Sequence, residues 1–127
     1  MTHLRGVKPP VSRDSNALTK APAPPKHLSP YARAEWKLIM PGLIERGIAT
    51  KSDLSGIAEL CTTRGLARTY GEALSIDPLD KVTFGMFNRA TQTSRQLAAE
   101  YGLSPVSRAR VGSAAPIDDE PNAMDME

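Results

Sequence analysis

The sequence predicts an all-α protein: a small helical domain of three main helices plus a short C-terminal helix, flanked by disordered N- and C-terminal tails. Two observations indicate this class. Apolar residues recur every three or four positions in three segments, and each segment is bounded by residues that start or end helices. No segment shows the sustained alternation of apolar and polar residues that is typical of strands.

The first helix is expected over about residues 30–46. The stretch "LSPYARAEW" offers Ser29 as the N-cap and Pro30 at the first helical position. Pro41 interrupts the apolar periodicity, so a kink or a break with a fresh helical turn is expected there. Gly47, followed by an isoleucine, predicts the C-terminal end of this helix.

The second helix is expected to begin at Thr50, with Asp53 in the spacing of a capping box, and to continue as one long helix. Three small residues, Ala58, Cys61 and Gly65, share one face of it. Another helix could approach closely there. The same stretch has the composition of a helix-turn-helix unit, but the glycine falls too late for the tight turn that such a unit needs.

The third helix is expected to follow the turn signal of Asp77 and Pro78, to start before Thr83 and to end at Gly102. A leucine and a second Ser-Pro pair then predict the start of a short helix over about residues 105–111.

Charge and composition divide the chain into a basic, Pro-rich disordered arm (1–27), a helical domain (28–111) and an acidic disordered tail (112–127). Residues 1–28 carry five Lys/Arg against one Asp, a net charge of +4, and the tail carries five acids and no base. This gradient suggests a polyanionic partner at one end and a basic partner at the other, although charged tails can also simply solubilise a protein. A folded part of about 80 residues is near the size at which self-association often supplies missing stability.

Catalytic constellations are missing from the sequence. The two histidines, His3 and His27, both lie in the arm, and Cys61 stands on the apolar face of a helix as a small buried residue. Asp77 and Asp80 fit turn chemistry better than a carboxylate pair. We therefore predict no catalytic residue, no metal, no cofactor and no membrane segment, and an intracellular protein with a reduced cysteine.

The clearest candidate site lies on the third helix, which has no acid between Asp80 and Glu100. Its polar residues on one face are Asn88, Arg89, Gln92, Arg95 and Gln96. Amide and guanidinium donors without acids suit phosphates, so this face is a candidate DNA-binding surface. The alternative is a polar stripe that faces solvent or a neighbouring subunit. Arg64 and Arg68 form a weaker pair, and Glu72 can neutralise the latter.

The arm supplies further candidate DNA contacts. Its cations are Arg5, Lys8, Arg13, Lys20 and Lys26. A flexible arm can reach phosphates but is poorly placed to read bases.

Two stretches, "HLSPYARAEWKLIMPGLIERGIATKSDLSGIAEL" and "LAAEYGLSPVSRARV", together with the long helix between them, resemble the terminase small subunits of tailed phages and prophages. The resemblance covers about residues 27–111. It implies a non-catalytic subunit, acting in the cytoplasm of the bacterial host, that forms a homo-oligomeric ring. It also implies recognition of double-stranded viral DNA and its presentation to the terminase large subunit, which holds the ATPase and nuclease.

By the same resemblance the short C-terminal helix belongs to the folded unit, and Arg108 and Arg110 match its closing arginines. They are therefore further candidates for DNA contact or for contact with a neighbouring subunit. Two other functions remain open from the sequence: a dimeric helical DNA-binding regulator, and an adaptor without DNA affinity of its own. The acidic tail is expected to dock on a basic surface of the large subunit.

Overall fold

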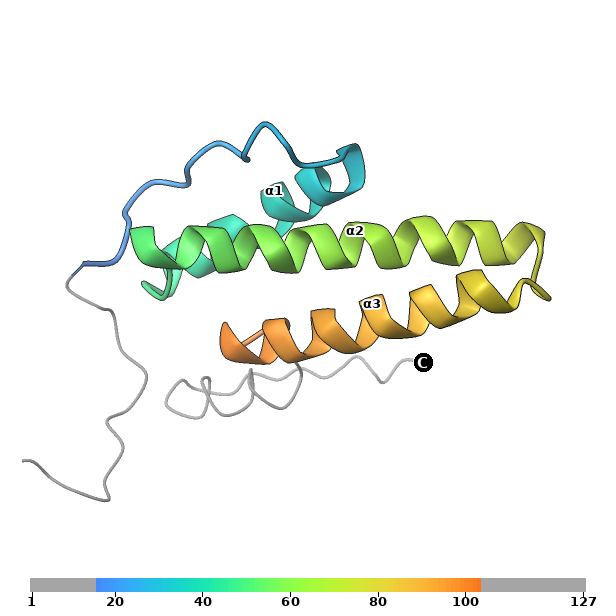
Figure 1. The fold of residues 1–127 in the computed structure, drawn as a ribbon. Coiled ribbons are helices and arrows are strands. Elements are labelled where there is room, and N and C mark those ends of the chain that lie inside the picture. The colour runs from blue at the N-terminus through green and yellow to red at the C-terminus, as the bar shows by residue number, and fades with distance from the viewer. Residues whose placement is uncertain (1–15, 104–127) are drawn as a thin grey trace, which may run out of the picture.

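The computed structural model describes residues 16–103, which form three α-helices and one turn of 3-10 helix (Figure 1). The elements are α1 (Pro30–Glu45), η1 (Lys51–Asp53), α2 (Leu54–Ile76) and α3 (Lys81–Glu100). Within the described residues the only β-type pairing is an isolated bridge between Ala17 and Thr50. The all-α prediction is confirmed, and the expected short helix at 105–111 lies outside the described residues.

Helix α2 is the central element of the fold. Both α1 and α3 pack against it, and Figure 1 shows α3 running back along α2 after a tight turn. The buried apolar core comes almost wholly from α1, the first half of α2 and the end of α3: Leu28, Ala32, Trp36, Ile39, Met40, Leu43, Ala49, Ile57, Ala58, Leu60, Cys61 and Ala98. The position of α3, and of everything it exposes, is therefore set by its packing on α2.

Helix α1 starts as the sequence predicts. The hydroxyl of Ser29 accepts a hydrogen bond from the N–H of Ala32 at 3.3 Å, and Pro30 occupies the first helical position. The expected break at Pro41 does not occur, because α1 continues through it to its end. Pro41 and Lys37 are both exposed, so water can bond the Lys37 carbonyl that proline leaves without its helical donor.

Glycine ends two of the helices, as predicted. Gly47 and Gly102 have φ angles of 67° and 71°, in the left-handed region that glycine adopts without steric cost. The residue after each glycine donates its N–H to a carbonyl five residues earlier, at 3.1 and 2.8 Å respectively. Both ends therefore have the hydrogen bond of a Schellman motif, which turns the chain back onto the helix it leaves.

The start of α2 also follows its sequence signal. The carboxylate of Asp53 accepts the N–H and the hydroxyl of Thr50, both at 2.9 Å, across the turn η1. The helix then runs without interruption through Gly65, so a helix-turn-helix unit is absent from this stretch. A Cβ atom at Gly65 would lie 2.9 Å from the backbone nitrogen of Ala32, which confirms the close approach of another helix to this face.

The prediction of disorder is wrong for residues 16–27, which we call the strap. The predicted disordered arm spans 1–27, but the strap follows a defined path along the helices (Figure 1). The N–H of Leu18 donates to the carbonyl of Ala49 at 2.9 Å, and the indole N–H of Trp36 donates to the carbonyl of Pro22 at 2.9 Å. A buried indole N–H needs an acceptor, and the strap backbone supplies it. Residues 1–15 and 104–127 lie outside the described part.

Candidate nucleic-acid interface

The outer side of α3 carries the polar residues that the sequence singled out. We call them the polar face: Asn88, Arg89, Gln92, Arg95 and Gln96, all of them exposed. The opposite side of the same helix buries Ala90, Ser94 and Ala98. The polar face is therefore held on a helix whose other side is fixed by packing, as the helical spacing predicts.

The two arginines of the polar face have no side-chain partner in the part of the chain that the structure describes. Arg89 and Arg95 make no hydrogen bond or ion pair with any residue from 16 to 103. The hydroxyls beside them bond to the backbone of α3, since Thr91 donates to the carbonyl of Asn88 and Ser94 to that of Thr91, each at 3.0 Å. Within residues 16–103, therefore, no acceptor occupies either guanidinium group.

Spacing along α3 determines what such an acceptor can be. Arg89 and Arg95 are six residues apart, which is about 9 Å along a helix that rises 1.5 Å per residue. Gln92 lies between them on the same face. Two guanidinium groups with an amide between them can bind phosphates, and on a rigid helix they can also reach base edges in a groove.

The weaker candidate pair on α2 does not add to this surface. Arg64 forms a short ion pair with Glu35 of α1, with Nη1 and Oε2 2.6 Å apart and both side chains mostly buried. Cys61 lies nearby in the core, where burial raises the pKa of its thiol to about 12 and the negative charge of Glu35 contributes in the same direction. Arg64 therefore has a structural partner, and Cys61 is the buried, unreactive thiol that the sequence predicts.

Arg68 is held by a cluster that the sequence predicts only in part. As expected, its Nε lies 3.8 Å from a carboxylate oxygen of Glu72. The guanidinium also lies 4.2 Å from the centre of the Tyr31 ring, and the Tyr31 hydroxyl donates to both Glu72 oxygens, at 2.7 and 2.6 Å. The hydrogen bond to Glu72 raises the pKa of Tyr31. The part played by Tyr31 has no local signal, because it comes from another helix.

Of the remaining predicted DNA contacts, the two that the structure describes do not join the polar face. Lys20 and Lys26 are exposed on the strap, which runs on the α1 side of α2, whereas α3 lies on the other side (Figure 1). The other five candidates lie outside the described residues: Arg5, Lys8, Arg13, Arg108 and Arg110.

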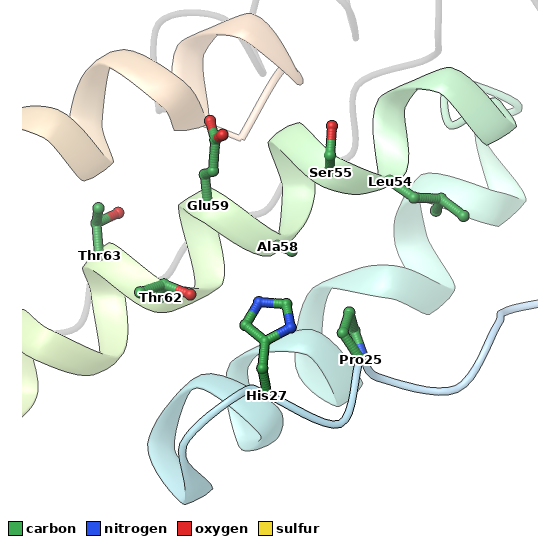
Figure 2. A pocket seen from close by; sticks show the side chains of 8 residues that line it. All are labelled: Pro25, His27, Leu54, Ser55, Ala58, Glu59, Thr62 and Thr63. Carbon is green, nitrogen blue, oxygen red and sulfur yellow. The ribbon is translucent and has the colours of Figure 1, made fainter.

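A shallow groove of about 550 Å³ lies between the strap and the first half of α2 (Figure 2). The His27 ring points from the strap toward α2 beside Ala58 and Thr62, while Glu59 points away from it. No three His, Cys, Asp or Glu side chains gather into a possible metal site within residues 16–103. The groove therefore presents apolar groups, hydroxyls and one imidazole rather than a metal-ligand set.

The two acids at the turn before α3 accept hydrogen bonds from backbone N–H groups. An oxygen of Asp77 accepts the N–H of Leu79 at 3.3 Å. The carboxylate of Asp80 accepts the N–H groups of Val82 and Thr83, at 3.1 and 3.2 Å, and the Thr83 hydroxyl at 2.8 Å. This confirms turn chemistry and helix capping as the role of both acids.

No family model, curated protein or solved structure matches this chain. None of the helices found between residues 16 and 103 is long and apolar enough to span a membrane.

Proposed function

We propose that this chain is the small subunit of a viral DNA-packaging terminase. In this proposal it has no catalytic activity of its own, recognises double-stranded viral DNA and presents it to the large subunit, whose ATPase and nuclease it regulates. It acts as a ring-shaped homo-oligomer in the cytoplasm of the bacterial host. The observation that carries the proposal is the polar face of α3, where Arg89 and Arg95 are exposed and unpaired among the described residues.

Electrostatics favours a polyanion as the ligand of this face. Helix α3 has no acid before Glu100, so nothing on its outer side neutralises the two arginines. By contrast, Arg64 and Arg68 on α2 each have an acidic partner. Two arginines without an acidic partner among residues 16–103, both on a single helix, support phosphate binding by that helix.

Self-association is supported by the uneven burial of the helices. No residue from 66 to 89 is buried, although this range spans the second half of α2 and the first half of α3. A chain that leaves so much of its longest helices exposed gains stability when copies associate.

The test is DNA binding over a salt series with the full chain. We compare the double variant Arg89→Ala/Arg95→Ala with a charge-matched control, Lys37→Ala/Lys51→Ala, which removes two exposed cations away from α3. Each lost phosphate contact lowers the slope of log affinity against log salt by about 0.9, so the α3 variant should lose up to about 1.8 and the control much less. The duplexes are the packaging-start region of the phage genome that encodes the chain and an unrelated sequence of equal length.

Three results would contradict the proposal. The first is a wild-type chain that binds neither duplex, which would indicate an adaptor. The second is an equal loss of slope in both variants, which would indicate diffuse attraction rather than a site on α3. The third is a stable dimer that binds DNA but does not stimulate the large subunit, which would indicate a regulator.

A further inference from the structure

The strap has the chemistry of an extended ligand. Prolines are concentrated in its middle: Pro22, Pro24 and Pro25. Each proline has a fixed φ angle and lacks a backbone N–H. Ala21 and Ala23 each precede a proline, whose ring restricts them to extended conformations. Residues 21–25 accordingly form no helix, strand or turn, and this stretch presents more carbonyl acceptors than N–H donors.

Two side chains of α1 bind the carbonyls of this segment. The indole N–H of Trp36 donates to the carbonyl of Pro22 at 2.9 Å. The guanidinium of Arg33 donates through Nη2 to the carbonyls of Lys26 and, just beyond the strap, Leu28, at 3.3 and 3.1 Å. Both groups can only donate, and a proline-rich backbone offers mainly acceptors. The contact therefore recognises an extended, proline-rich backbone, in the way that aromatic grooves recognise such segments in other proteins.

The strap occupies this site without filling it. No residue from 16 to 27 is buried. The first part of the strap is held by a backbone hydrogen bond from the N–H of Leu18 to the carbonyl of Ala49, at 2.9 Å. Beside its other end, the groove of about 550 Å³ lies open between Pro25, His27 and α2 (Figure 2). A ligand with a larger apolar side chain at this end would bury more surface than the strap does.

We propose that the surface of α1 and α2 under the strap is a docking site for an extended, proline-rich segment. The strap occupies this site in cis, and a proline-rich segment of a partner protein occupies it in trans after displacing the strap. The strap is thus an autoinhibitory ligand of its own docking site. The inference goes beyond the proposed function, since it requires neither DNA nor a terminase.

Competition between the two ligands determines when the site opens. A tethered ligand has an effective concentration on the order of millimolar, so the strap excludes weak partners. A partner segment overcomes this advantage by burying a further apolar side chain in the groove that the strap leaves open. Its prolines also fix its backbone before binding, so that little conformational entropy is lost on docking. The site is therefore selective for partners that are both proline-rich and apolar at one end.

The first test loosens the strap in the full chain. Pro24→Gly/Pro25→Gly removes the restriction of the backbone and should raise the population of the open strap about tenfold. Trp36 is the only tryptophan, so its indole N–H gives one resolved signal, and the hydrogen exchange of this N–H should become faster by the same factor. The matched control is Pro9→Gly/Pro10→Gly, a second Pro-Pro pair outside the described residues, which should leave the exchange at the wild-type rate.

The second test supplies the strap in trans, as a fluorescent synthetic peptide of residues 16–27, and measures its anisotropy with each full chain. The apparent affinity is proportional to the fraction of chains whose site is open, so Pro24→Gly/Pro25→Gly should bind the peptide about tenfold more tightly than the wild type. The control variant of the first test should bind it like the wild type. A peptide with glycine in place of both Pro24 and Pro25 should bind every chain at least about tenfold more weakly.

The site of binding is checked by hydrogen exchange of the chain. Saturating unlabelled peptide should release the N–H of Leu18 from Ala49 and make its exchange faster, whereas the N–H of Ile48, which bonds to Leu43, should stay protected. This measurement also applies to the wild type, so the inference stays testable if the glycine variant loses helical circular dichroism. Three results would overturn it: a peptide that no chain binds, binding that leaves Leu18 protected, and equal affinity for the peptide without its prolines.

Discussion

The two ends of the α2–α3 pair differ sharply in how they are stabilised. At the end where α2 begins and α3 ends, α1 and the strap cover the helices, and Trp36 is 2 % exposed. We call this the core half, residues 16–65 and 90–103. At the other end, residues 66–89, which we call the hairpin half, no side chain is buried.

The difference shows that helix length and core size need not agree. The core half has three layers and encloses an apolar interior, so its residues gain the full free energy of burial. The hairpin half has two helices and gains only what one face of each can bury. The outer surface of this half is exposed. The buried core and most of the exposed large apolar side chains of α2 and α3 thus lie at different ends of the same two helices.

The largest expected effect is a difference in the free energy of unfolding between two variants, each of which lacks one aromatic residue of one half. Trp36→Ala should lower the free energy of unfolding by about 3–5 kcal/mol, because it leaves a cavity and also removes the hydrogen bond to Pro22 in the strap. Phe84→Ala, with 53 % of the residue exposed, should change it by no more than about 0.5 kcal/mol in the dissociated chain. Urea denaturation at low protein concentration measures both.

Comparable losses in the free energy of unfolding of the two variants would contradict the division of the molecule into two halves. In that case the hairpin half would contribute to the core, and the exposure of its apolar residues could not be explained by a missing layer. The slope of the urea transition is a useful control, because a change in slope would indicate altered compactness rather than altered stability.

A smaller contrast comes from two glycines inside helices. Gly65→Ala should cost about 1–3 kcal/mol, because the added methyl would lie 2.9 Å from the Ala32 nitrogen and α1 would have to move. Gly42→Ala has open space and should instead gain up to about 1 kcal/mol through better helix propensity. Thermal unfolding of the two variants should therefore shift in opposite directions from the wild type. A shift in the same direction would mean that α1 and α2 are not in close contact.

Helix ends could be predicted from the sequence because their signals are local. Ser29, Gly47 and the Thr50 to Asp53 pair each act within one turn, and the structure confirms all of them. Of the kink or break expected at Pro41, the break is wrong: α1 continues, because an exposed proline leaves an exposed carbonyl that water can satisfy. The path of the strap could not be predicted, because it depends on a Trp36 indole that finds its acceptor 14 residues earlier in the chain.

The candidate site, like the fold, could be predicted from the sequence only in part. Helical spacing predicts that Arg89, Gln92 and Arg95 share a face, and the structure shows that face exposed. The exposure of Val82 was not predicted, since helical spacing places it with the apolar residues of α3. Periodicity tells which side of a helix is apolar but not how far a neighbouring helix extends along it.

The smallest expected effect is confined to the first turn of α3. Asp80→Ala removes the acceptor for the Val82 and Thr83 N–H groups, so these amides should exchange with solvent faster, while the unfolding of the core half stays unchanged. Asp80→Asn keeps a side-chain oxygen and should restore most of the protection. The hydrogen bonds from Thr83, its backbone N–H first and then its hydroxyl, lower the pKa of Asp80 below the usual value of 3.8. Because the folded state has the lower pKa, the protection is complete above the ordinary carboxyl range and is lost only as the pH falls through the lowered value. Hydrogen exchange followed amide by amide down to acidic pH measures both effects. Faster exchange in Asp80→Ala that spread into α1 would show that the two halves unfold together, and the comparison between them would then no longer hold.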